Sequence, residues 1–216
     1  GYGSNDLKFQ TVKSDVRKYW RFGKDYTLAV RGFFGKSLGP NKQKFFLGGI
    51  PYLLTGGGET NGQEDNSHFR EVLLDTSNAS LIHDIYFTEY AWPLRGARFA
   101  ERFGNNTSLF NLEVRFPFIN YLALGFPLKV IFGNIRGHAF MDIGAAWDSP
   151  DEFASTQWPE RYGPNASGDY SPWVTTAGLG TKINLGYFLL KIEMAWDKNP
   201  NGYSKPQWYF SLGPDW

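Results

Sequence analysis

The chain of 216 residues has no cysteine, which excludes disulfide frameworks, cysteine-ligated metals and thiol nucleophiles. It also lacks a run of about 18 apolar residues, so it encodes no membrane-spanning helix. Neither sign of charge predominates, because Lys and Arg total 22 and Asp and Glu total 21. A net charge of +1 gives no reason to expect a nucleic-acid partner or an acidic substrate.

The residues that are abundant point to one fold class. Aromatic residues make up 18% of the chain, and 25 residues are glycine. This mixture favours aromatic strands joined by turns over a helical bundle. The length suits a single domain with a real core. We therefore expect an all-β protein with one domain over residues 1–216.

Apolar and polar residues alternate in seven segments, which is the pattern of strands with one apolar face. The pattern is clearest near the end of the chain, where Trp208, Phe210 and Leu212 alternate with smaller or polar residues. The seven segments are 11–22, 26–31, 110–118, 138–147, 176–185, 187–197 and 208–216. We expect these seven segments to form an antiparallel sheet.

The alternation is compatible with two kinds of sheet. A transmembrane barrel explains the charged side chains opposite long apolar faces, and it explains why short turns alternate with long loops. A soluble β-sandwich or a lipocalin-like barrel would also give strict alternation, with the charges in water. The odd count of seven does not match the even number typical of bacterial barrels. Either one strand escapes the pattern, or the first strands lie outside this chain.

Four motifs follow one another in the order of the chain. They are KFFLGGI with Gly48 and Gly49, WPLRGARF with Arg95 and Gly96, a strand reading NLEVRFPF with Glu113, and the strand FMDIGAAW with Asp142 and Gly144. An aromatic strand ends the sequence. Together these motifs resemble the C-terminal part of the BamA/TamA-type bacterial surface-antigen superfamily of outer-membrane barrels. Ala97 departs from that pattern, which has an aromatic residue after the glycine.

The resemblance implies an antiparallel transmembrane β-barrel of sixteen strands, of which this chain supplies the last seven. Residues 38–106 would be a long loop that folds into the lumen. The earlier strands and any periplasmic domain would then lie outside this chain. The implied location is the bacterial outer membrane, in contact with its lipid. The implied partners are client outer-membrane proteins, periplasmic or lipoprotein accessory subunits, and the remaining part of the barrel.

Within this resemblance, Arg95 projects from the loop toward the inner wall. The alternation independently places Asp142 and Glu113 on polar strand faces, where they offer carboxylates to the guanidinium. Arginine can bond a carboxylate through two N–H groups, which lysine cannot copy. Gly96 would let the backbone approach the wall closely. We expect a latch that positions the loop and takes no part in covalent chemistry.

The final strand has two compatible interpretations. Trp208, Phe210 and Trp216 resemble the signal by which barrel clients are delivered to the assembly machinery. They would equally serve as the lipid-facing side of a last strand. If this strand pairs weakly with the absent first strand, the seam could open and template a client's edge.

Other functions have weaker support in the sequence. The stretch TGGGETNG lacks the Gly-Lys-Ser/Thr context of a phosphate-binding loop. His68, His83 and His138 lack metal-ligand spacing, and we expect no metal and no cofactor. Ser67, His68 and Asn66 are residue types found in the catalytic site of an outer-membrane lipase. However, the side chains of adjacent residues on an extended backbone point apart. We therefore expect a protein that is not an enzyme, assisting insertion or translocation of outer-membrane proteins; a structural or transport pore is the alternative and a lipase the third.

Overall fold

The computed structural model describes residues 8–49, 88–91, 94–97, 100–124, 130–163, 166, 168–184, 189–199 and 202–213. Its main sheet runs in the order β1, β2, β6, β7, β8, β9, and β9 also pairs with both β10 and β11. All of these pairs are antiparallel. The strands are β1 (Gln10–Phe22), β2 (Tyr26–Leu38), β6 (Asn106–Leu124), β7 (Val130–Trp147), β8 (Trp173–Asn184), β9 (Leu189–Asn199), β10 (Gly202–Tyr203) and β11 (Gln207–Gly213).

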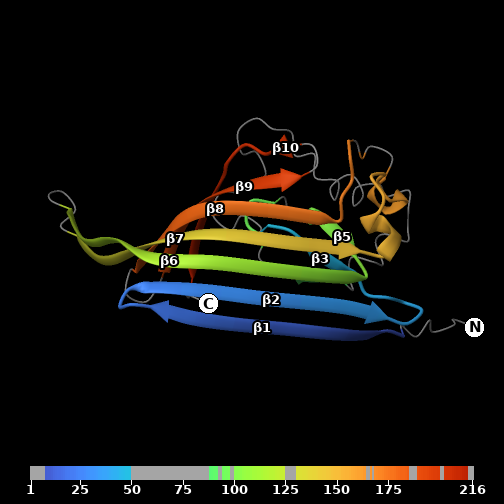
Figure 1. Ribbon diagram of the computed structural model, residues 1–216, viewed down its shortest axis with the longest axis horizontal. Coiled ribbons are helices and arrows are strands. Elements are labelled where there is room, and N and C mark those ends of the chain that lie inside the picture. The colour runs from blue at the N-terminus through green and yellow to red at the C-terminus, as the bar shows by residue number, and fades with distance from the viewer. Residues whose placement is uncertain are drawn as a thin grey trace, which may run out of the picture.

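In Figure 1 these strands lie side by side, with β1 in blue at one edge and the C-terminal strands in red at the other. Each of the seven predicted segments supplies one long strand, and the all-β antiparallel prediction is confirmed. The described helical segments are two single 3-10 turns, neither of which has the length and apolar character to cross a membrane.

Several strands are longer than the alternation predicts. The predicted segment ends at Phe118, yet residues 120–124 still belong to β6. The register shifts between Pro117 and Ile119, where proline removes a ladder donor, and pairing then resumes. Similarly, β2 continues to Leu38, beyond the consecutive aromatic residues Phe33 and Phe34 that break the alternation.

The two faces of the main sheet have opposite character. Large apolar side chains stand exposed on one face, among them Val16 on β1, Val114 on β6 and Leu179 on β8. Charged side chains are buried on the other face. These are Glu113, His138, Asp142, Lys182, Lys191, Glu193 and Asp197. Apolar outside and polar inside is the arrangement of a transmembrane barrel wall.

The segment 38–106 contains a small sheet of its own. β3 (Phe45–Leu47) pairs in parallel with β4 (Glu89–Ala91) and antiparallel with β5 (Arg102–Gly104). This sheet packs on the polar face of the main sheet. Leu47 is fully buried in a cluster with Leu94, Ala97, Leu109, Ala146 and Val174. The packing of Leu47 on the wall needs Gly144 on β7, where an added Cβ would lie 2.7 Å from Leu47 Cδ2.

The described residues 148–163, 166 and 168–172 form a cap over the other side of the small sheet. The cap carries η1 (Pro150–Phe153) and η2 (Glu160–Tyr162), drawn in orange at one end of the sheet in Figure 1. Its Tyr162 and Tyr170 form one buried cluster with Phe46, Ala100 and Phe103. The ring of Phe103 lies 4.6 Å from that of Tyr162, centroid to centroid. The small sheet is therefore enclosed between the wall and the cap.

Ion pairing stabilises this cap. Glu152 accepts hydrogen bonds from Arg161 (Nη1–Oε1, 2.7 Å) and from the Tyr170 hydroxyl (Oη–Oε2, 2.8 Å). Burial alone would raise the pKa of Glu152, but Arg161, the Asp148 N–H and Tyr170 outweigh it and lower the pKa below 4.5. A carboxylate with a lowered folded-state pKa stabilises the fold above its unfolded pKa. That contribution is lost as the pH falls through the lowered value.

We predict that the cap loosens as the pH falls below about 4.5. Trp158 fluorescence and proteolysis within residues 150–170 measure the loosening. Glu152→Gln should loosen the cap at neutral pH and flatten its pH profile in this range. Glu160→Gln, at an exposed position on η2, is the matched control and should behave as wild type. Identical pH profiles for wild type and Glu152→Gln would contradict the prediction.

Candidate functional site

The Arg95 turn lies against the inner wall. Residues 94–97 form a tight turn in which the Leu94 N–H donates to the Gly48 carbonyl (3.1 Å) and the Ala97 N–H donates to the Leu94 carbonyl (3.2 Å). Leu94 is fully buried and anchors the turn in the cluster around Leu47. Gly96 has φ +92°, a conformation that favours glycine. These features aim Arg95 away from its own turn and into the wall.

Arg95 bonds three carboxylates from three different strands. Its Nε and Nη2 reach Asp142 Oδ2 and Oδ1 at 2.9 and 3.0 Å, and its backbone N–H donates to Oδ2 at 3.1 Å. Its Nη1 donates to Glu113 Oε2 at 2.8 Å and to Glu193 Oε1 at 3.3 Å. Arg95 is 4% exposed and Asp142 0%. The structure thus brings the predicted Asp142 and Glu113 together at Arg95 and adds Glu193.

A second layer of groups neutralises and orients these carboxylates. Glu113 Oε1 accepts from Arg115 Nε (2.7 Å) and Lys182 Nζ (2.8 Å). Asn111 Nδ2 donates to Asp142 Oδ1 at 2.8 Å. His138 Nε2 lies 2.7 Å from Glu193 Oε1. Three carboxylates therefore face three permanent cations, Arg95, Arg115 and Lys182. We call this group of side chains, together with Asn111 and His138, the ion cluster.

The register of the wall strands creates the space for Arg95. Phe140 pairs with Gly178 of β8, and Gly178 pairs with Ala195 of β9. The Phe140 ring lies flat under the Arg95 guanidinium, 3.6 Å from Cζ to the ring centroid. Glycine on the inner face of β8 makes room for this ring and for the neighbouring His138. A Cβ on Gly180 would lie 2.5 Å from His138 Cε1.

Electrostatics keep Arg95 charged. Burial alone would lower the pKa of its guanidinium, but Asp142, Glu193 and Glu113 outweigh burial and raise the pKa. Breaking a buried ion pair by removing one partner costs about 3–5 kcal/mol, because it leaves an uncompensated charge. Removal of Arg95 or of Asp142 is therefore expected to destabilise the docked turn.

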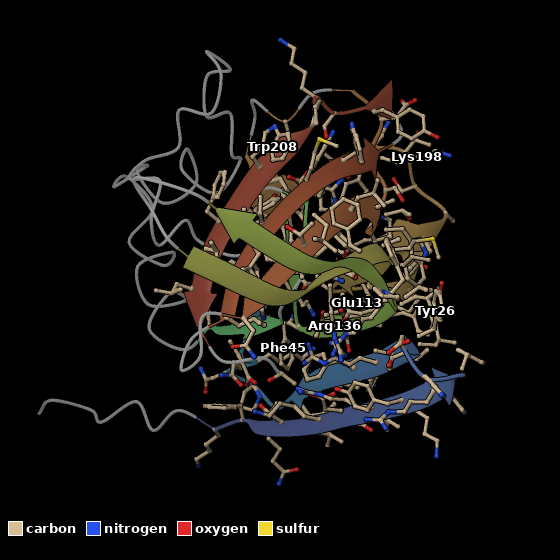
Figure 2. All side chains as sticks on the ribbon, turned by 90° about the vertical axis from the view of Figure 1, so that its left-hand side faces the viewer. Tyr26, Phe45, Glu113, Arg136, Lys198 and Trp208 are labelled. Atoms are coloured by element: carbon tan, nitrogen blue, oxygen red, sulfur yellow. The ribbon has the colours of Figure 1, made fainter. Side chains whose placement is uncertain are left out.

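In Figure 2 the labelled Glu113 lies between the blue strands β1 and β2 and the red C-terminal strands. A cavity opens beside it, lined from the wall by residues of β1, β2, β6, β8 and β9. Its charged lining is Arg17, Arg31, Arg95, Glu113, Arg115, Lys182, Lys191 and Glu193. The ion cluster therefore borders a polar interior, and the apolar face of the sheet points away from it.

The comparison with known families decides the classification. The Omp85 superfamily domain model matches residues 1–216, the entire chain. The chain belongs to the Omp85 superfamily. The predicted resemblance to BamA/TamA-type surface-antigen barrels is consistent with this match and is confirmed at the level of the family. Omp85 proteins are outer-membrane β-barrels that insert or translocate proteins. None of the individual curated proteins compared with the chain matches it.

The other predicted residues of this Omp85 chain have separate positions. Gly48 supplies the carbonyl that holds Leu94, and Gly49 packs so closely on the Ala97 carbonyl that a Cβ would not fit. Trp208 and Phe210 are exposed on the apolar face of β11, at 48% and 42%. Trp216 lies outside the described residues. Ala97 is 2% exposed and packs in the cluster around Leu47, so its small side chain fills a buried position.

The residues weighed for catalysis or metal binding in this Omp85 chain are mostly outside the described part. Asn66, Ser67, His68, His83 and the TGGGETNG stretch all lie there. His138 is described and is buried beside Glu193. Within the described ranges, no group of three His, Asp or Glu side chains is arranged to hold a metal ion.

Sequence reasoning missed several members of the site. Alternation places Glu193, Arg115, Lys182 and His138 on polar strand faces, but it does not tell which strands bring them to one point. Tyr209 carried no usable signal. The Tyr209 hydroxyl accepts a hydrogen bond from the Gly96 N–H at 2.9 Å. Gly178 and Gly180 were the available sequence signal for the packing of this site. Two glycines on one strand face indicate that other groups approach the strand closely there.

We predict that Gly96→Ala destabilises the docked turn by about 1–3 kcal/mol. Alanine is strained at φ +92°, and its Cβ would lie 2.9 Å from Ala195 Cβ and 3.2 Å from the Trp196 carbonyl oxygen. The thermal unfolding midpoint in detergent measures the loss. Gly32→Ala on β2 is the matched control, because nothing lies within 4 Å of its added Cβ. Equal midpoints for the two variants would refute the close approach.

Proposed function

We propose that this Omp85 chain forms part of an outer-membrane barrel that assists the insertion or translocation of outer-membrane proteins, and that Arg95 latches its inner loop. The observation that carries the proposal is the ion cluster, in which one loop arginine meets carboxylates of β6, β7 and β9. The work is conformational and involves no covalent chemistry.

The latch has two discrete states, because a buried charge tolerates no intermediate position. When Arg95 is docked, its charge is balanced by three carboxylates in a water-poor setting. When it leaves, Asp142, 0% exposed, loses the cation that balances its charge and keeps the hydrogen bond from the Asn111 amide. Water must then enter the cluster to solvate the carboxylates. The loop therefore switches between a docked and a hydrated position, which is the behaviour that positioning a client requires.

The partners follow from the two faces and the edges of the sheet. The exposed apolar face suits outer-membrane lipid. Among the described residues, β11 pairs only with β9 and β1 only with β2. Unpaired strand edges are costly in lipid and accept further strands. We assign these edges to the remaining barrel strands and to client proteins, with β11 and its Trp208 and Phe210 at the seam. Periplasmic or lipoprotein accessory subunits complete the proposed assembly.

A pore within a larger outer-membrane complex is the second candidate. The charged cavity beside the ion cluster favours it, because a polar interior can conduct ions. The two functions make different demands. A pore passes ionic current in planar bilayers without a client, whereas an insertase accelerates the folding of a client barrel in liposomes.

We predict that Arg95→Ala in the full-length protein slows client folding in liposomes about tenfold or more and exposes the loop to protease. The physical reason is that removing Arg95 leaves buried carboxylates uncompensated, which costs about 3–5 kcal/mol. Arg95→Lys should rescue only partly, since lysine cannot form the two-pronged bond to Asp142. Arg136→Ala, on an exposed side chain of β7, is the control and should retain full activity.

Unchanged client folding together with unchanged protease protection would show that the latch is wrong. Large ionic current combined with no acceleration of client folding by the wild type would instead favour the pore.

A further inference from the structure

Tyr209 bonds the last strand of the sheet to the docked turn. It lies on β11 opposite Glu193 of β9. Its neighbours Trp208 and Phe210 face outward, so Tyr209 faces inward, where it is 7% exposed and packs with Phe140 and Ala195. Phe140 is also the ring on which Arg95 rests. Tyr209 therefore adjoins the ion cluster from a strand that contributes no charge to it.

The Tyr209 hydroxyl bonds both to the turn and to its own strand. It accepts from the backbone N–H of Gly96 at 2.9 Å, and it donates to Gln207 Oε1 on its own strand at 2.8 Å. Gly96 directly follows Arg95, whose backbone N–H is bound to Asp142. A short chain of bonds thus runs from the wall carboxylate, through the turn, to the last strand.

We propose that Tyr209 couples the docked state of the Arg95 turn to the pairing of β11, as a positioning residue of the seam. This inference rests on the latch proposed above. When the turn undocks, the Tyr209 hydroxyl loses this N–H donor in a buried position. β11 has seven residues and pairs on one side only in the described structure, so the bond to Gly96 adds to its pairing with β9.

The coupling is reciprocal. If β11 moves away from β9 to receive another strand, the buried Gly96 N–H loses its acceptor, which weakens the docking of Arg95. Opening the seam and releasing the loop therefore favour each other. Trp208 and Phe210 cannot mediate this coupling, because their side chains lie on the opposite face of β11.

Hydrogen exchange in the full-length protein tests the coupling. Backbone amides of residues 94–97 and 207–213 are followed in wild type, Arg95→Ala, Tyr209→Phe and the double variant. Tyr209→Phe keeps the buried ring and removes only the hydroxyl. Tyr203→Phe, at a 75% exposed position just before β11, is the matched control. If Arg95→Ala yields no folded protein, Arg95→Lys takes its place.

We expect Tyr209→Phe to speed exchange about five- to tenfold in both segments, the effect of one lost hydrogen bond. Arg95→Ala should also speed exchange in β11, and the double variant should add little to it. Tyr203→Phe should match wild type.

Two results would overturn the inference, and they differ in what they say of the latch. Faster exchange of residues 94–97 in Arg95→Ala, with β11 unchanged, leaves the latch intact and removes the coupling. Unchanged exchange in both segments of Arg95→Ala removes the latch and the coupling together.

Discussion

The buried charge of Arg95 is the constraint on which this structure depends. Carboxylates of β6, β7 and β9 converge on it from positions 113, 142 and 193, and without a cation these three groups would repel one another in a water-poor setting. The glycines nearby follow from the same demand: Gly96 brings the turn against β9, and Gly178 and Gly180 clear the wall for Phe140 and His138. The docked position of the Arg95 turn thus depends on this guanidinium.

The reversed polarity of the sheet explains why such a cluster can exist. Apolar side chains occupy the outer face, so charged ones are forced into the interior, where they must be paired. The small β3–β5 sheet fills part of this interior and is held at two places. The ion cluster and the Leu47 cluster attach it to the wall, and the aromatic cap around Tyr162 covers its other side. Both attachments combine apolar packing with a buried arginine–carboxylate pair, Arg95–Asp142 and Arg161–Glu152.

The strands and part of the site could be predicted from the sequence, each for a physical reason. Alternation has a period of two, so it placed Asp142 and Glu113 on the inner faces, and the Arg95–Gly96 motif identified the loop residue that meets them. Alternation is local, however, and carries no information on which distant strands meet. Glu193, 98 positions beyond Arg95, joined the site only through the register of β7, β8 and β9. Likewise, the alternation stops near Pro117 and at the Phe33–Phe34 pair although both strands continue, and only cross-strand pairing shows the continuation. The strands β3 to β5 have three residues each and are too short to leave a pattern.

The central claim is that the buried interaction between Arg95 and Asp142 stabilises the fold. The most direct test is a double-mutant cycle on the free energy of unfolding of the full-length protein, with Arg95→Ala, Asp142→Ala and the two combined. The account predicts that each single variant is strongly destabilised and that the double variant is less so than the sum, with a coupling energy of about 2–3 kcal/mol. Additive effects of the two substitutions would contradict it.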